Sequence, residues 1–217
     1  MNTPSIQAIQ TAAKTLGLPL MLKSRRGGYD GRGNAALNDI SPTSISAALQ
    51  SLGVKDADDD SELDLYAEGW INFHSEVAVM VVRSITGETR AYPTVNAIQT
   101  DSICRVVLAP ARNISSALRH RCEDIAMKAI DSLGKGATGV FGVEMFLAKK
   151  SGGEELEVLL NEVAPRPHNT GHFTQDACAV SQFENHLRAV AGLPLGDTSM
   201  CVGAAASEYF EHVCANV

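Results

Sequence analysis

The sequence predicts an α+β fold with mainly antiparallel sheets. Several runs of β-type residues follow one another with only turn signals between them, such as Thr-Gly-Glu at 86–88. Two further runs flank Ser-Gly-Gly-Glu at 151–154, which is typical of a hairpin. Four helical segments have their own start and stop residues outside these runs. Strands joined by hairpins, with helices packed on one side, indicate the α+β class.

Four helices are expected from capping residues and the 3.6-residue apolar period. Each of the first three has a start signal and a glycine after it: Thr3-Pro4 and Gly17, Ser41-Pro42 and Gly53, Asn113 and Gly134. A fourth helix is expected over residues 174–191. Its apolar positions should face inward, namely Ala177, Val180, Phe183, Leu187 and Val190.

The expected strands are short runs rich in Val, Ile, Leu and Phe, bounded by turn residues. They cover residues 18–24, 76–84, 90–98, 104–112, 139–150 and 155–166. The segment 55–60 is acidic and is expected to be a solvated loop.

Composition restricts the class of protein. The chain has 217 residues, which suffices for one large domain or two small lobes. Its net charge of −7 argues against nucleic acid as a partner, and no apolar run is long enough for a membrane span. The N-terminus lacks the pattern of a secretion signal. Five widely spaced cysteines with no CxxC pair predict reduced thiols in a cytoplasmic protein, and argue against zinc or a disulfide framework.

The segment 22–34 is rich in glycine and basic residues. Four glycines allow backbone N–H groups to converge on an anion: Gly27, Gly28, Gly31 and Gly33. Four cations accompany them: Lys23, Arg25, Arg26 and Arg32. This combination suits a polyphosphate, although the spacing matches neither a Walker A motif nor a dinucleotide fingerprint. A glycine-rich hairpin with surface arginines is the equal alternative.

Two glutamates are expected to face each other across the last hairpin. A turn centred on Gly153 places Glu144 directly opposite Glu162, on one face of the sheet. Two like charges among apolar neighbours need compensation, and Mg²⁺ commonly takes one or two protein carboxylates together with phosphate oxygens and water. Asn161 could help position a ligand. The alternative is a pair of glutamates that simply face solvent.

The stretch "APRPHNTGH" follows Glu162 almost at once. Its two prolines prevent continuation as a central strand and hold the intervening side chains in fixed directions. Arg166 could bind an oxyanion, and His168 and Asn169 could hydrogen-bond or transfer protons nearby. A structural role in a proline turn is the alternative, and for His172 a cap on the next helix is the simpler role.

Four stretches together resemble a known family: "LMLKSRRGGYDGRGN", "LYAEGWINFHSEVAVMV", "VFGVEMF" and "LLNEVAPRPHNTGHFTQDACAVSQFENHLRAVAGLPLG". They are similar to the ATP-grasp domain of the carboxyaminoimidazole ribonucleotide synthetases, including the fungal-type phosphoribosylaminoimidazole carboxylases. The resemblance covers roughly residues 3–197. It implies an ATP-grasp fold of two lobes that grip ATP. The expected limits are 1–66 for the small lobe, 67–195 for the large lobe and 196–217 for an irregular tail.

The resemblance implies ATP- and Mg²⁺-dependent carboxylation of aminoimidazole ribonucleotide by bicarbonate, through carboxyphosphate, in purine biosynthesis. The implied partners are these substrates, with a homodimer as a possible assembly. A non-catalytic ATP-binding module and another ATP-grasp ligase are the alternatives.

The implied site residues fall into groups. ATP would be bound by Lys23, Gly28, Tyr29, Asp30, Gly31, Arg32, Gly33, Asn34, Glu68, Gly69, Trp70, Ile71, Glu76, Asn161 and Glu162. Magnesium would be held by Glu144 and Glu162. Bicarbonate and carboxyphosphate would be handled by Arg166, His168 and Asn169. Tyr29 and Asp30 would lie near the imidazole substrate, with Asp30 near its exocyclic amine.

The chain also departs from the family. The family has a preceding Rossmann-like domain and a small C-terminal domain, and its fungal members have a fused mutase-like domain; none of these is matched here. The chain alone is therefore expected to turn over little or no substrate. Gln99 stands where the family often has a histidine.

Overall fold

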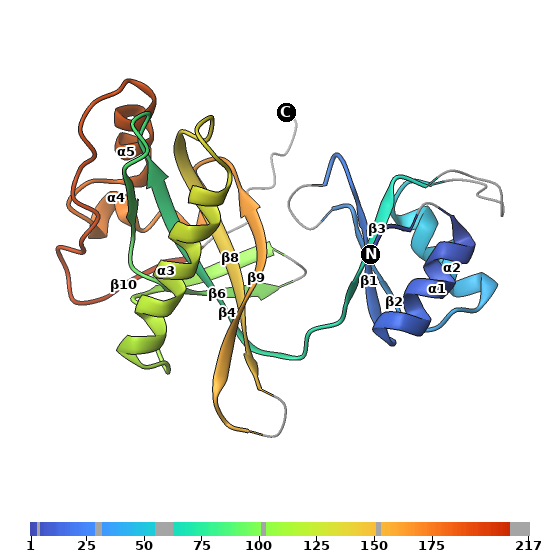
Figure 1. The fold of residues 1–217 in the computed structure, drawn as a ribbon. Helices are drawn as coiled ribbons and strands as arrows, with labels where there is room; N and C mark the ends of the chain where they lie inside the picture. The colour runs from blue at the N-terminus through green and yellow to red at the C-terminus, as the bar shows by residue number, and fades with distance from the viewer. Residues whose placement is uncertain (4, 29–31, 55–62, 101–102, 151–152, 209–217) are drawn as a thin grey trace, which may run out of the picture. The chain divides into compact units, whose positions relative to one another are not determined.

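A computed structural model of the chain describes residues 1–3, 5–28, 32–54, 63–100, 103–150 and 153–208. The chain forms two compact units (Figure 1). Unit 1 comprises Met1–Asn72 and Asp101–Ile103, and unit 2 comprises Phe73–Thr100 and Cys104–Val217. The two units meet along the chain at Asn72 and Phe73. The lobe limits that the resemblance implied, at 66 and 195, stay predictions. Among the described residues, no helix has the length and apolar character needed to cross a bilayer.

Unit 1 is a three-stranded antiparallel sheet, of order β2-β1-β3, with two helices. Its elements are α1 Ile6–Leu16, β1 Leu20–Ser24, β2 Asn34–Leu37, α2 Pro42–Ser51 and β3 Leu65–Gly69. Alternate strand residues such as Leu20 and Leu22 are buried with the helices in one core. The residues between them, such as Met21 and Lys23, occupy the second face of the sheet because side chains alternate along a strand.

Helix α1 begins later than predicted. Ser5 is its N-cap and accepts a hydrogen bond from the N–H of Ala8 at 3.2 Å, so the cap is not Thr3. Thr3 is instead buried, and its N–H donates to the carbonyl of Leu65. Pro4 lies outside the described residues. The cap predicted for α2 is confirmed, since Ser41 accepts from the N–H of Ser44.

Unit 2 contains an antiparallel sheet of seven strands in the order β10-β7-β6-β4-β8-β9, with β5 also paired to β4. Its strands are β4 Phe73–Arg83, β5 Thr89–Ala91, β6 Val95–Thr100, β7 Ile103–Ala109, β8 Gly139–Lys149, β9 Leu156–Ala164 and β10 Ala205–Glu208. Its helices are α3 Ser116–Ser132, the 3-10 turn η1 Asn169–Gly171, α4 Thr174–Ala177 and α5 Gln182–Val190. The predicted α+β class with mainly antiparallel sheets is confirmed.

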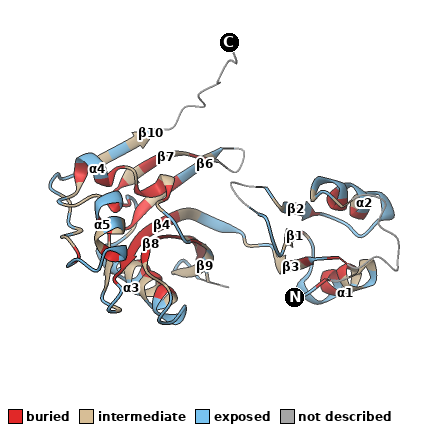
Figure 2. Ribbon diagram, turned by 90° about the horizontal axis from the view of Figure 1, so that it is seen from above, coloured by how far each residue is buried: buried red, intermediate tan, exposed pale blue. Residues whose placement is uncertain are grey.

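The central strands β4 and β8 are covered on both faces. Val77 and Val143 pack in one core with α3, while Ala78 and Met80 on the alternate positions pack with residues from the α4 and α5 region. Figure 2 shows buried residues concentrated along these two strands. Because both faces are buried, β4 is a nearly continuous apolar run from Val77 to Val82.

Three predicted elements are placed differently. Ser115, not Asn113, caps α3 by accepting from the N–H of Leu118. The run 90–98 divides into β5 and β6 on either side of Pro93, which has no N–H for a ladder bond. Residues 205–208 of the tail that was expected to be irregular form strand β10, paired with β7.

The single helix predicted over 174–191 is two helices. Ser181 is extended and caps α5. The helical period therefore restarts after Ser181, and a different set of side chains faces inward. The predicted inward positions Phe183, Leu187 and Val190 are 36%, 65% and 49% exposed. The buried face of α5 consists instead of Gln182, Asn185 and Ala189.

Candidate functional site

Glu144 and Glu162 are directly paired across β8 and β9, as predicted. The pairing does not come from a regular turn centred on Gly153, as the sequence argument assumed. Nearer the turn, Met145 pairs with Leu160, so regular alternation would bring Asn161 opposite Glu144. The register shifts between Glu144 and Met145, and Asn161 is the extra residue of a β-bulge. The bulge turns Glu162 to the same face as Glu144.

Glu144 is a largely buried carboxyl group. Its side chain is 13% exposed, whereas Glu162 is exposed. Burial is the main cause that raises the pKa of Glu144 to about 7, and the negative charges of Glu162 and Glu76 add to it. Arg166 acts in the opposite direction and lowers that pKa. A buried carboxylate beside a second one is stabilised when a cation arrives.

Glu76 is a third carboxylate on this face. Ala78 pairs with Glu144, and Glu76 lies two positions before Ala78 on β4, so its side chain is on the same side. Burial raises the pKa of Glu76, a side-chain hydrogen bond with Gln99 lowers it, and the charge of Glu162 raises it again. A hollow of about 370 Å³ adjoins Glu76 and Gln99.

These carboxylates do not form a complete metal centre. In the described ranges, no group of three or more His, Cys, Asp or Glu side chains could hold a metal ion. Glu144 and Glu162 supply two hard oxygen donors, so further ligands would have to come from a bound phosphate or from water. Mg²⁺ is commonly bound in that way.

His168 lies beside Glu144, with its Nε2 3.8 Å from Glu144 Oε1. The histidine is buried, and its backbone is held on both sides by Gln182. The N–H of His168 donates to Gln182 Oε1 at 3.0 Å, and Gln182 Nε2 donates to the carbonyl of His168 at 2.9 Å. The N–H of Gln182 donates in turn to Thr174 Oγ1 at 2.9 Å. His168 is therefore fixed by a buried polar network.

Arg166 and Asn169 flank this histidine. The N–H of Arg166 donates to the carbonyl of Ala164 at 2.9 Å, which makes a tight turn around Pro165. Arg166 is exposed, and its Nη1 donates to the carbonyl of Pro167 at 3.2 Å. Asn169 opens η1 and is partly buried. Unit 2 thus brings together the predicted residues Glu76, Glu144, Glu162, Arg166 and His168. Asn161 and Asn169 lie next to Glu162 and His168 in the chain.

Gln182, Thr170 and Thr174 support this site but were not predicted from the sequence. All three are fully buried polar residues. No spacing motif marks them, because their partners are backbone groups and ring nitrogens brought together by the fold. The one sign of this role in the sequence is Gln182, a polar residue among the apolar positions of the helix expected over 174–191.

In unit 1, Lys23 lies on the second face of the sheet and forms an ion pair with Glu68. The distance from Nζ to Oε2 is 2.7 Å, and the two side chains are 13% and 43% exposed. Lys23 pairs with Tyr66 in the strand register, and Glu68 lies two positions further on the same face. Gly69 ends β3, Trp70 is 43% exposed and Ile71 is partly buried.

The glycine-rich segment forms the connection of an antiparallel hairpin. Lys23 pairs with Asn34, and the N–H of Ser24 donates to the carbonyl of Gly33 at 2.8 Å. Gly33 has a φ of +84°, and a Cβ there would lie 3.0 Å from the Cα of Gly28. The glycines thus permit a close approach of two backbone segments. Arg32 is exposed. Tyr29, Asp30 and Gly31 lie outside the described residues, so their predicted roles stay predictions.

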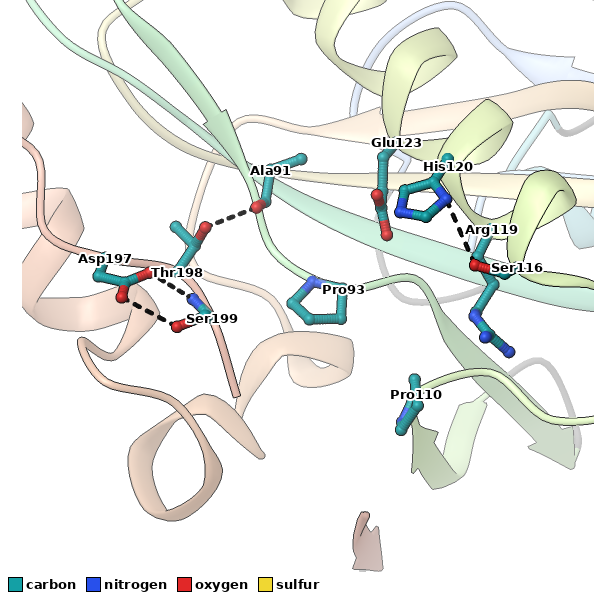
Figure 3. Close-up of a pocket in the computed structure, with 10 residues that line it drawn as sticks. All are labelled: Ala91, Pro93, Pro110, Ser116, Arg119, His120, Glu123, Asp197, Thr198 and Ser199. Carbon is teal, nitrogen blue, oxygen red and sulfur yellow. Dashed lines mark hydrogen bonds between the residues drawn. The ribbon is translucent and has the colours of Figure 1, made fainter. Parts of the chain in front are cut away.

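Unit 2 has a second hollow of about 370 Å³, lined by α3 and the segment 197–199 (Figure 3). Arg119 Nη1 donates to the carbonyls of Ala111 and Ile114, and Glu123 accepts from the N–H of Thr94. Because these groups bond to the chain itself, we assign them a structural role.

Known proteins resemble the chain over most of its length. The ATP-grasp domain family matches residues 1–183. Phosphoribosylaminoimidazole carboxylase from Schizosaccharomyces pombe is 43% identical over 196 residues, which are 90% of this chain and 32% of that protein. The chain thus spans about a third of the length of the curated fungal relatives it matches.

Two solved structures are also similar. Carboxyaminoimidazole ribonucleotide synthase from Aspergillus clavatus, complexed with ATP, has a TM-score of 0.77 and 42% identity, covering 91% of this chain and 48% of that one. N5-carboxyaminoimidazole synthase from the same organism, with ADP and 5-aminoimidazole ribonucleotide, has a TM-score of 0.75 and 39% identity. That match covers 92% of this chain and 47% of the other. The family match and these structural similarities show that the chain belongs to the ATP-grasp family.

Proposed function

We propose that this chain binds Mg²⁺-ATP and serves the carboxylation of 5-aminoimidazole ribonucleotide by bicarbonate, a step of purine biosynthesis. The names of the relatives support the reaction, because they are carboxylases and synthases of this ribonucleotide. Two solved relatives contain ATP, or ADP with the ribonucleotide. This agreement supports the same substrates for this chain.

The observation that carries the proposal is the arrangement around Glu144. A buried carboxyl group with a pKa raised to about 7 lies opposite Glu162 and 3.8 Å from His168 Nε2. Arg166 lies near enough to lower that pKa. This site combines two carboxylates that can hold a cation with the guanidinium of Arg166 and the imidazole of His168. Such a combination suits phosphoryl transfer to a small oxyanion.

The chemistry has two steps. An oxygen of bicarbonate attacks the γ-phosphorus of ATP, ADP leaves, and carboxyphosphate forms. The exocyclic amine of the ribonucleotide then attacks the carboxyl carbon, phosphate leaves, and the amine loses a proton. Arg166 would contact oxygens that gain charge in the first step, and His168 and Asn169 would orient bicarbonate.

Magnesium fits this site as a ligand of Glu144 and Glu162. The fit rests on the opposed carboxylates and on the high pKa of the buried one, both of which favour a bound cation. Bound magnesium would supply charge neutralisation for the phosphate oxygens of ATP.

The remaining assignments are proposals of the same kind. Lys23 would bind phosphate, and its neighbour Glu68 would lie beside the adenine together with Gly69, Trp70 and Ile71. The segment from Gly28 to Asn34 would cover the phosphates. Glu76 would bind the ribose and Asn161 would help hold the nucleotide, while Tyr29 and Asp30 would meet the ribonucleotide.

We further propose a homodimer and a cytoplasmic location. The exposed apolar face of α5, formed by Phe183, Leu187 and Val190, supports an interface. Glu184 and Arg188 on the same helix are paired with each other, with 2.7 Å between Arg188 Nη2 and Glu184 Oε1, so the proposed interface depends on the apolar side chains. The four described cysteines are free thiols, which supports a reducing compartment.

A chimera tests the proposed function. Residues of this chain replace the matching 196-residue segment of the Schizosaccharomyces pombe carboxylase. ADP formation is then measured with and without the ribonucleotide and bicarbonate. We expect ADP formation that requires both substrates, and loss of this activity in the same chimera with Glu162→Gln. A folded chimera that binds Mg²⁺-ATP but forms no carboxylated product would overturn the proposal.

A further inference from the structure

The ring of His168 has one nitrogen facing Thr170 and the other facing Glu144. Nδ1 lies 2.9 Å from Thr170 Oγ1, and the N–H of Thr170 donates to Nδ1 over a longer 3.5 Å. Nε2 lies 3.8 Å from Glu144 Oε1. The tautomer of the ring therefore decides whether a proton or a lone pair faces Glu144.

Two donors compete for the lone pair of Nδ1. A backbone N–H can only donate, so the contact with the N–H of Thr170 requires Nδ1 to be an acceptor. The hydroxyl of Thr170 can donate to Nδ1 or to Met80 Sδ, which lies 3.8 Å away. A thioether is a weak acceptor, so the shorter contact with Nδ1 takes the hydroxyl proton. In a neutral ring, the remaining proton is then on Nε2.

The ring has little freedom to leave this arrangement. A Cβ on Gly142 would lie 2.7 Å from the Cβ of His168, so the histidine packs directly on that glycine. Gln182 holds the N–H and the carbonyl of His168 together. The hydroxyl, the backbone N–H and the packing thus act on the same ring.

We propose that Thr170 is a positioning residue that fixes neutral His168 as the Nε2–H tautomer. The ring then presents a hydrogen-bond donor toward Glu144 and toward any anion bound there. His168 would orient a carboxylate-like oxygen rather than remove a proton from bicarbonate. This catalytic meaning rests on the proposed function, whereas the tautomer itself does not.

Nuclear magnetic resonance of the ¹⁵N-labelled chain tests the tautomer without any ligand. Spectra that correlate imidazole nitrogens with ring protons are recorded at about pH 8, above the ordinary histidine pKa of about 6.5. His168 is assigned from the signals lost in His168→Gln. His186 is the internal reference, because its Nδ1 accepts from the N–H of Val140 at 3.1 Å.

We expect a protonated Nε2 for both His168 and the reference His186. Thr170→Val should give a mixture of tautomers, and Thr170→Ser should restore the single form. Met80→Leu, which removes the competing acceptor, should leave the tautomer unchanged. A proton on Nδ1 in the wild-type chain, or a shift of tautomer in Met80→Leu, would overturn the proposal; the wild-type spectrum decides even if Thr170→Val does not fold.

Kinetics of the chimera separate this inference from the proposed function. With carboxylation present, Thr170→Val should lower kcat on the order of tenfold at unchanged Mg²⁺-ATP affinity, and Thr170→Ser should recover most of it. Equal kcat values for the unchanged chimera, Thr170→Val and Thr170→Ser would contradict the positioning role of Thr170 but not the proposed function. If His168 has the expected tautomer but the chimera does not carboxylate the ribonucleotide, the proposed function is contradicted and the tautomer is not.

Discussion

Glu144 lies directly opposite Glu162 across the β8–β9 hairpin, and the bulge at Asn161 puts both carboxylates on one face. This face carries His168 against Gly142, immediately beside the pair. The pair therefore joins a buried carboxyl group, Glu144, to an exposed one, Glu162, beside the buried ring of His168.

Removal of either carboxylate should weaken magnesium-dependent ATP binding. Glu144→Gln and Glu162→Gln keep the shape of the side chain but lose its charge. We expect a roughly ten- to hundredfold loss of affinity in each, as for one charge-assisted contact. Calorimetry with and without Mg²⁺ measures this, and Glu157→Gln on the same strand is the matched control. Unchanged magnesium-dependent affinity in both variants would remove the metal assignment.

The stability of the metal-free chain should depend on pH through Glu144. The folded state keeps the proton up to a pKa of about 7, whereas the ordinary pKa of a glutamate is 4.5. Stability relative to Glu144→Gln is therefore full below about pH 4.5 and is lost as the pH rises through 7. The loss is at most about 3 kcal/mol.

Urea unfolding in chelator, at several pH values, measures this effect. Between the two pKa values, the free energy of unfolding of the wild-type chain should fall relative to that of Glu144→Gln. Above pH 7 the difference between the two proteins should stay constant. A difference that does not change with pH would show that burial does not hold the proton on Glu144.

Lys23 should contribute to binding of the phosphates of ATP. Lys23→Ala is expected to weaken ATP binding roughly tenfold, because one charge-assisted contact is lost. Lys14→Ala, on the exposed side of α1, is the control. Glu68→Gln should test the ion pair, since it removes the competing carboxylate 2.7 Å from Nζ. An ATP affinity that is the same in Lys23→Ala and Lys14→Ala would reassign Lys23 to a structural role.

Arg166 and His168 should affect turnover more than ATP affinity. Their expected contacts form mainly in the transition state, so Arg166→Ala and His168→Ala should lower bicarbonate-dependent ATP cleavage about a hundredfold in the chimera. ATP affinity should stay nearly unchanged. Variants that lose affinity in proportion to rate, or that keep full rate, would mean that this stretch is structural.

The exposed face of α5 should control assembly. Leu187→Glu places a charge at the centre of this face and should convert a dimer to a monomer, while Gln175→Glu on α4 should not. Light scattering after size-exclusion chromatography measures the mass. A wild-type chain that is monomeric at all concentrations tested would contradict the proposed homodimer.

The sequence determined much of the fold through local signals. The cap at Ser41, the hairpin around 151–154 and the apolar runs depend on neighbouring residues, so their elements could be predicted. The pairing of Glu144 with Glu162 was also predicted, although through a regular turn. The pairing of Met145 with Leu160 centres the turn half a residue before Gly153, and the bulge at Asn161 brings Glu162 back opposite Glu144.

Other features were decided only by the tertiary structure. The phase of α5 depends on the extended Ser181 that restarts the helix, so an apolar period alone pointed to the wrong face. Asn185 is buried there because it donates to Tyr92 and accepts from the N–H of Gly196. Burial of a polar side chain is favourable only when such partners are supplied, and here they come from distant segments.

The same reason separates the predicted from the missed parts of the site. Charged residues such as Glu162 and Arg166 are visible in the sequence because their chemistry is unusual next to apolar strands. Thr170 and Gln182 act through hydrogen bonds to His168, and nothing in their spacing marks them. The sequence by itself determined which groups could react. The tertiary structure decided which of them are buried and which neighbours hold them, because burial and hydrogen bonding depend on contacts between segments far apart in the chain.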